Sequence, residues 1–425
     1  MRTVRRYTPS MRSAPPPVGP GDPARPGRRA AFRGAALALP FAVLGAVEGV
    51  LRLADVADDP PAMTGPAIDL AAPELTVRDP ELLWTFRPSA VLDVPSLGIS
   101  GVRTNARGLR GPDVPDRREP GELRVVCIGD SVTFGLGLAD DRTFPARLEA
   151  ALRADPRLAG RTVRVLNAGV PGYSAVQGER LLRRLADVRP DVVVAWFGMN
   201  DAKPSLGRPD AQLRGDGATS GAAPGSSLRI VRVLSRALRS QPSTRVPPDD
   251  FRAANAGIAA AAGACGADLV VVSTPHRLRE SLDELREAAD RAAREGATTI
   301  VASDPYLSPY TPTPFPDERQ LARTERAADG TLRLVLGRSD PRPTSGVSLR
   351  EVEDRCALLR DWLAHVEALD AALGPDVLRA PELFGTVPPG EAMSDNCHLT
   401  ERGAELAGAA LARRCAEIAA RRRQN

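Results

Sequence analysis

The stretch LRVVCIGDS, residues 123–131, decides the fold. Its first six residues are apolar or β-branched apart from one arginine, which predicts a buried strand, and the Gly-Asp-Ser that follows predicts a tight turn. Three later runs have the same character: residues 163–166 (VRVL), 191–197 (DVVVAWF) and 268–273 (DLVVVS). Helical patterns, including residues 144–152 and 176–188, separate these runs. Strands of this kind alternating with helices indicate a parallel sheet covered on both faces, so we expect a three-layer α/β/α sandwich.

The carboxyl ends of the predicted strands are where functional groups should gather. Gly129, Asp130 and Ser131 come directly after the first strand, and Ser131 is near the start of a helix, where free backbone N–H groups can bind a developing oxyanion. Gly129 permits the tight turn. Asp and Ser are also common helix N-caps, so this tripeptide alone does not establish a catalytic site.

Two further segments follow the ends of the second and third strands. The first, NAGVPGYS, contains Gly172, and the second, GMND, contains Gly198, Asn200 and Asp201. A glycine N–H and an asparagine amide are suitable donors to the oxyanion of an acyl-transfer reaction. Each segment alone is typical of a turn, but their order after consecutive strands favours a shared site.

A candidate base lies near the carboxyl terminus in the segment DNCH, residues 395–398. The spacing allows the Asp395 carboxylate to meet Nδ1 of His398, so that Nε2 can face a serine. The chain has only two other histidines, His276 after a predicted strand and His365 in a helical pattern. Neither has an acidic residue at a comparable spacing in a turn, so His398 is the predicted base.

In chain order, the segments GDS, NAGVPG, GMND and DNCH resemble the four signature blocks of the SGNH (GDSL) hydrolase family. The resemblance runs from residue 123 to about residue 420, and TNARGLRGPDVP at residues 104–115 resembles a segment of anchored bacterial members. The resemblance implies a flavodoxin-like parallel sheet. Methionine 199 stands where glycine is common in the third block.

The same resemblance implies a role for each matching residue. Ser131 is the expected nucleophile, His398 the base and Asp395 the acid that orients it. The expected oxyanion donors are the N–H groups of Ser131 and Gly172 and the side-chain amide of Asn200. The remaining motif residues, expected to support the loops, are Gly129, Asp130, Gly198 and Asp201.

These residues predict a serine esterase that acts through an acyl-enzyme, with a small-molecule, lipid or glycan ester as substrate. An envelope glycan O-acyltransferase or deacetylase would use the same residues. A catalytically silent envelope binding protein is a third reading. We expect no cofactor and no metal, because the five cysteines lack CxxC or CxxH spacing and no GxGxxG or phosphate loop is present.

The charge distribution argues against nucleic acid as a partner. The whole chain carries a formal charge of +4, but residues 1–33 hold eight arginines and one aspartate, so the rest is slightly acidic. A nucleic-acid-binding domain requires a basic surface. The sequence leaves the oligomeric state open.

The remaining sequence predicts the organisation of the chain. We expect a disordered basic tail at residues 1–34, a membrane anchor or signal segment at 35–52, a stalk of irregular structure at 53–122 and the hydrolase domain at 123–425. A buried amphipathic helix is the alternative for the apolar stretch within 35–52. Residues 203–250 and 276–348 are long insertions expected to rim or cap the site. The arginines before the apolar stretch favour a catalytic domain outside the cytoplasm, at the cell membrane or exported.

Overall fold

The structure is a computed structural model. It describes residues 39, 43–50, 52, 76–94, 99–205, 209–213, 244–302, 323–326, 332–336 and 345–422. Contacts divide the chain into a unit of residues 1–60 and 224–238 and a second unit of residues 61–223 and 239–425. The first unit contributes only the helical residues 39, 43–50 and 52 to the description.

The amino-terminal predictions fall largely on residues outside this description. The predicted basic tail at 1–34 lies wholly outside it. No helix among the described residues is both long and apolar enough to span a bilayer. Of the predicted membrane anchor or signal segment at 35–52, residues 35–38, 40–42 and 51 lie outside the description.

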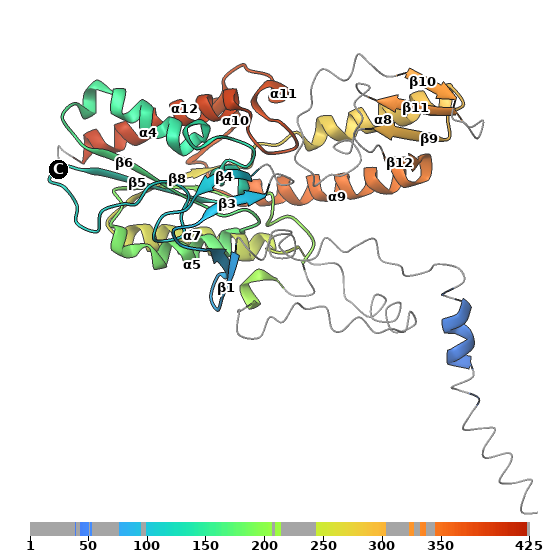
Figure 1. Cartoon of the computed structure of the whole chain (residues 1–425), viewed down its shortest axis with the longest axis horizontal. Coiled ribbons are helices and arrows are strands. Elements are labelled where there is room, and N and C mark those ends of the chain that lie inside the picture. The colour runs from blue at the N-terminus through green and yellow to red at the C-terminus, as the bar shows by residue number, and fades with distance from the viewer. Residues whose placement is uncertain are drawn as a thin grey trace, which may run out of the picture. The chain divides into compact units, whose positions relative to one another are not determined.

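The second unit is organised around a parallel sheet of five strands (Figure 1). In spatial order these are β13 (Val377–Leu378), β8 (Asp268–Val272), β7 (Val192–Trp196), β5 (Leu123–Gly129) and β6 (Val163–Gly169). All neighbouring pairs are parallel. Of the strands in this sheet, β5 comes first along the chain, and it lies between β6 and β7, which come second and third. This is the flavodoxin-like order. The fold class predicted from the sequence is confirmed.

Helices cover both faces of this sheet (Figure 1). One face carries α5 (Ala175–Arg184) and α7 (Pro248–Ala264), and the other carries α4 (Phe144–Ala154) and α12 (Glu401–Arg421). Alternate residues of β5 explain the three layers: Val126 and Ile128 belong to the core on the α5 side, whereas Val125 and Cys127 belong to the core on the α12 side.

The remaining described elements lie around this core. Two longer helices, α8 (Leu278–Arg294) and α9 (Leu349–Ala372), pack together. A second, four-stranded sheet has the order β10-β11-β9-β12. Its strands are β9 (Thr299–Ala302), β10 (Arg323–Arg326), β11 (Leu332–Leu336) and β12 (Ser345–Ser348). The short helices are α3 (Ser131–Phe134), α10 (Ala380–Phe384) and α11 (Pro389–Ala392).

The two predicted insertions are described only in part. Helix α8 and the small sheet occupy the second insertion, whose proline-rich residues 308–316 lie outside the described residues. Of the first insertion, residues 206–208 and 214–243 also lie outside. Its described ends meet through a bridge between Pro204 and Thr244.

The segment before β5 is more regular than its sequence indicated. Strands β1 (Thr76–Asp79) and β2 (Leu83–Phe86) form one antiparallel hairpin, and β3 (Val91–Val94) and β4 (Ile99–Arg103) form another. Irregular structure was predicted over these residues. Leu82, Trp84 and Phe86 are buried in the α5-side core at alternate positions, a strand periodicity that the surrounding Pro and Asp residues obscure.

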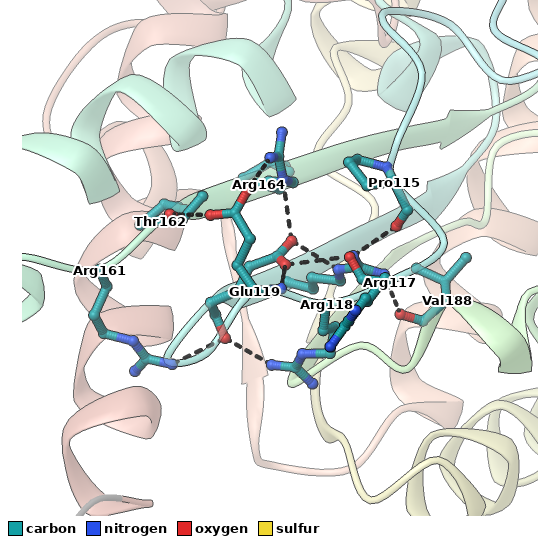
Figure 2. A network of polar contacts seen from close by, with 12 residues as sticks. Pro115, Arg117, Arg118, Glu119, Arg161, Thr162, Arg164 and Val188 are labelled. Carbon is teal, nitrogen blue, oxygen red and sulfur yellow. Dashed lines mark hydrogen bonds and ion pairs between the residues drawn. The ribbon is translucent and has the colours of Figure 1, made fainter.

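A charged network lies at the amino ends of β5 and β6 (Figure 2). The Gly-Asp-Ser turn lies at the opposite end of β5. Arg124 and Glu122 form a buried ion pair with an Nε–Oε1 distance of 2.7 Å. Arg124 also donates to the carbonyl oxygens of Pro115 (2.7 Å) and Val188 (3.1 Å). This guanidinium therefore ties the chain preceding β5 to the sheet.

Candidate active site

The Gly-Asp-Ser turn places Ser131 at the first position of helix α3, directly after β5. Asp130 caps this helix, because its Oδ1 accepts from the Val132 N–H at 2.9 Å. Position 129 has no room for a side chain: a Cβ there would lie 2.0 Å from Thr133 Oγ1 and 2.7 Å from the Trp196 carbonyl oxygen. Glycine 129 thus allows the tight junction that presents Ser131.

The turn at residues 395–398 brings the acid and the imidazole together. Asp395 Oδ1 accepts from the backbone N–H groups of Cys397 and His398, both at 2.8 Å. Asp395 Oδ2 lies 2.6 Å from His398 Nδ1, and His398 Nε2 lies 2.8 Å from Ser131 Oγ. Because a carboxylate can only accept, Nδ1 is the donor to Asp395, and Nε2 of the neutral imidazole is free to accept from the serine hydroxyl. Asp395, His398 and Ser131 form one hydrogen-bonded chain.

The three expected oxyanion donors follow β5, β6 and β7, whose ends are in register at Gly129, Gly169 and Trp196. Gly172 has a positive φ of 83°, which suits glycine. Among the described residues, neither the Ser131 N–H nor the Gly172 N–H has a hydrogen-bond partner. Two backbone donors are therefore left for a ligand.

The Asn200 side chain links these strand ends. Its Nδ2 donates to Asp130 Oδ2 at 3.0 Å and to the Tyr173 carbonyl oxygen at a longer 3.3 Å. Asn200 is buried, and its amide contacts the residue before Ser131 and the residue after Gly172. Both amide hydrogens are thus engaged, and the bond to Tyr173 is the longer and weaker one, so a stronger acceptor in the site can compete with the Tyr173 carbonyl for that hydrogen.

A family model described as the GDSL-like lipase/acylhydrolase family matches residues 127–406 of the chain. The chain belongs to this family. No curated protein matches its sequence.

Solved structures similar to this GDSL-family chain include three hydrolases. The SGNH-hydrolase family esterase AlinE4 is 20% identical with a TM-score of 0.23, over 36% of this chain, and the chain spans only 59% of that protein. A GDSL-like lipase from Bacteroides thetaiotaomicron is 14% identical with a TM-score of 0.32, over 72% of this chain and 92% of the other. A lipase/acylhydrolase from Enterococcus faecalis is 15% identical with a TM-score of 0.31, over 69% and 96%.

The charge state of the GDSL-family site depends on burial and on the Asp395–His398 pair. Burial disfavours the imidazolium, but the adjacent Cys397 and Asp395 raise the pKa of His398 well above its usual value. Burial also raises the pKa of the Cys397 thiol, so this thiol is neutral near pH 7 and Asp395 is the negative charge that acts. Burial opposes ionisation of Asp395, yet His398 and two backbone N–H groups lower the pKa of this carboxyl.

The Asp201 carboxylate bonds two segments near the site. Its Oδ1 accepts from the Ala175 N–H at 2.8 Å and its Oδ2 from the Gly198 N–H at 3.1 Å. Complete burial raises its pKa to about 7. Gly198 has a φ of +139°, and a Cβ there would lie 1.9 Å from Thr274 Oγ1. Asp201 therefore joins the start of α5 to the turn that carries Asn200.

Three residues outside the four blocks contact the site, and the sequence did not single them out. Lys203 Nζ donates to Asn200 Oδ1 at 2.8 Å, and Arg245 Nη1 donates to the Gly172 carbonyl oxygen at 2.8 Å. Trp362 of α9 donates to the carbonyl oxygen of residue 199 at 3.2 Å. Only Lys203 had a usable signal, being the one lysine in the chain and three residues after Asn200.

The other candidate ligands and bases do not join the hydrogen-bonded chain. His276 is half-buried and its Nδ1 has no hydrogen-bond partner in the described part of the chain, while His365 is exposed on α9. Among the described residues, one group could hold a metal ion, formed by Asp395, Cys397 and His398. Two of its three ligand atoms are engaged in the 2.6 Å Asp395–His398 hydrogen bond, so this group fits the orientation of an imidazole better than metal binding.

Proposed function

We propose that the protein is a serine ester hydrolase in which Ser131 is the nucleophile, His398 the general base and Asp395 the residue that orients the imidazole. The observation that carries this proposal is the 2.8 Å contact between His398 Nε2 and Ser131 Oγ, with Nδ1 held by Asp395. Membership of a lipase/acylhydrolase family supports the same reaction class.

The reaction proceeds in two steps. His398 Nε2 takes the hydroxyl proton as Ser131 Oγ bonds to the ester carbonyl carbon, and the carbonyl π electrons move to oxygen. The Ser131 N–H, the Gly172 N–H and Asn200 Nδ2 donate to this oxyanion. The intermediate collapses to an acyl-enzyme, and the departing alcohol takes the proton from His398. Water, activated by His398, then releases the acid and regenerates Ser131.

The test is hydrolysis of a p-nitrophenyl ester series from acetyl upward by the full chain. Ser131→Ala should lose essentially all turnover, whereas Ser100→Ala, which removes a hydroxyl at an exposed position of β4, should keep the wild-type rate. Turnover that survives in Ser131→Ala would contradict the assignment of the nucleophile.

Products distinguish hydrolysis from transfer. With acetylated polysaccharide or lysophospholipid as donor, a hydrolase releases free acid in amounts equal to the deacylated donor. Ester that reappears on an added glycan acceptor would instead identify an acyltransferase using the same residues. A folded protein that neither hydrolyses nor transfers would favour the silent binding protein.

A further inference from the structure

Lys203 follows the third signature block, and its side chain turns back toward the site. It is the only lysine among 57 basic residues, the others being arginines. Its backbone N–H donates to the Asn200 carbonyl oxygen at 3.2 Å, and its Nζ donates to Asn200 Oδ1 at 2.8 Å. The side-chain amide that faces the oxyanion position is thus held on its carbonyl side by a cation.

The partners of Asn200 define a single orientation of its amide. Nδ2 faces two oxygen acceptors, Asp130 Oδ2 and the Tyr173 carbonyl, and Oδ1 faces the Lys203 ammonium. A flipped amide would direct its oxygen at a carboxylate and a carbonyl, and its NH₂ at an ammonium. Asn200 is 4% exposed, so without Lys203 its Oδ1 would be a buried acceptor short of a strong donor.

The surroundings of Lys203 fix the ammonium in place. Its carbonyl oxygen accepts from the Arg245 N–H at 2.7 Å, where the two ends of the first insertion meet. Its Nζ lies 6.0 Å from the centre of the Trp362 ring. Burial lowers the pKa of Lys203, and the negative charges of Asp130 and Asp395 act against that shift. Lys203 is half-buried, and a partly desolvated cation acts more strongly on the dipole that it contacts than a cation in open water does.

We propose that Lys203 is a positioning residue of the oxyanion hole: its ammonium fixes the orientation of the Asn200 amide and polarises it, so that Nδ2 donates more strongly to the oxyanion. A hydrogen bond accepted by an amide oxygen withdraws electron density from the nitrogen and strengthens its N–H donors. The charge also favours the negative oxygen that develops in the transition state. This inference rests on the proposed esterase function.

The test is a double-mutant cycle on p-nitrophenyl ester hydrolysis. Lys203→Met keeps an unbranched side chain of similar length but removes the donor and the charge, and should lower kcat about tenfold with little change in KM. Lys203→Arg keeps a cationic donor and should recover a large part of that loss. In an Asn200→Ala background, Lys203→Met should have no further effect on kcat, because the group through which it acts is gone.

Two results would overturn the inference: a wild-type kcat in Lys203→Met, or the same proportional loss in both backgrounds. The second would mean that Lys203 acts without Asn200. Wild-type protein without Ser131-dependent turnover would instead overturn the proposed function, so the two failures are distinguishable.

A measurement that does not depend on turnover tests the contact between Lys203 and Asn200 even if the Lys203 variants fold poorly. Because Lys203 is the only lysine, protein labelled with ¹⁵Nζ-lysine gives a single side-chain ammonium signal. We expect the ammonium hydrogens to exchange slowly with water in the wild type and in an Asn255→Ala control, and to exchange faster in Asn200→Ala. Equal exchange in all three would contradict the contact with Asn200.

Discussion

Arg110, thirteen residues before β5, binds the carbonyl oxygen of Phe134 at the end of the helix that begins with Ser131. The Nη1–O distance is 2.9 Å, and the same atom lies 2.9 Å from the Gly135 carbonyl oxygen. Its Nη2 donates to the Leu138 carbonyl oxygen at 2.6 Å. Four-residue helices are weak on their own, so this guanidinium holds the helix that presents the candidate nucleophile.

Replacing Arg110 should therefore destabilise the domain. Arg110→Ala would leave several buried carbonyl oxygens without a donor, at a cost of about 2–4 kcal/mol in the free energy of unfolding. The matched control is Arg107→Ala, three residues away, whose guanidinium pairs with Asp116 and Asp187 near the surface and should contribute less than about 1 kcal/mol. Urea unfolding of both variants measures the difference. Equal losses would show that Arg110 is not a special support of α3.

The Asn200 amide gives a prediction about rate rather than stability. Asn200→Ala should lower kcat by about 10²–10³, because one of three oxyanion donors is lost, while the fold persists. Asn255→Ala removes an amide on α7 that bonds the Phe251 carbonyl oxygen and should leave kcat unchanged. Steady-state kinetics with circular dichroism measures both effects. Full activity of Asn200→Ala would remove Asn200 from the oxyanion hole.

The Asp395–His398 pair predicts the pH dependence of hydrolysis. A pKa of His398 above its usual value means that kcat/KM falls as pH decreases through that raised pKa, since the imidazolium cannot act as a base. In Asp395→Asn the carboxylate that favours the imidazolium is gone. The acid limb should then move to lower pH while the maximal rate drops. A pH profile of kcat/KM for both proteins measures this, and an acid limb that stays in place would show that Asp395 does not set the pKa of His398.

Asp201 predicts a pH dependence of stability. Its folded pKa of about 7 lies above the ordinary value of 3.8, so the folded state binds the proton more tightly than the unfolded state. The contribution of this group is fully present below pH 3.8 and is lost as pH rises through about 7.

Urea unfolding at a series of pH values, compared with Asp201→Asn, isolates this effect from that of other titrating groups. Asn at this position does not titrate and resembles the protonated carboxyl group, with one acceptor oxygen and one donor group. The stability of the wild type relative to the variant should therefore be greatest below pH 3.8 and should fall as pH rises through about 7. A stability difference independent of pH would contradict the raised pKa.

The fold was largely readable from the sequence because buried parallel strands are continuous apolar runs, as in residues 123–128 and 191–197. The hairpins over residues 76–103 were not predicted, because each strand is short and depends on long-range burial. Their anchors include a bond from Gln177 to the Leu82 carbonyl oxygen, 95 residues away in sequence. Pairing of this kind has no local signal.

The candidate site was predictable only where its residues belong to short motifs in the sequence. Ser131 and the Asp395–His398 turn occupy short local motifs, and the structure places them in contact, while their roles stay predictions. Lys203 and Arg110 act on amide or carbonyl oxygens through long flexible side chains. Such contacts depend on where the chain folds back and carry no periodicity; the sequence marks Lys203 only as the one lysine of the chain, three residues after Asn200, and it does not indicate what either side chain contacts.

The most direct test of the account is labelling of the full chain with a fluorophosphonate probe, followed by identification of the modified residue by mass spectrometry. We predict one label per chain, located on Ser131, with labelling abolished in Ser131→Ala and in His398→Ala and retained in Ser100→Ala. Absence of label in folded wild-type protein, or a label on another residue, would contradict an activated Ser131.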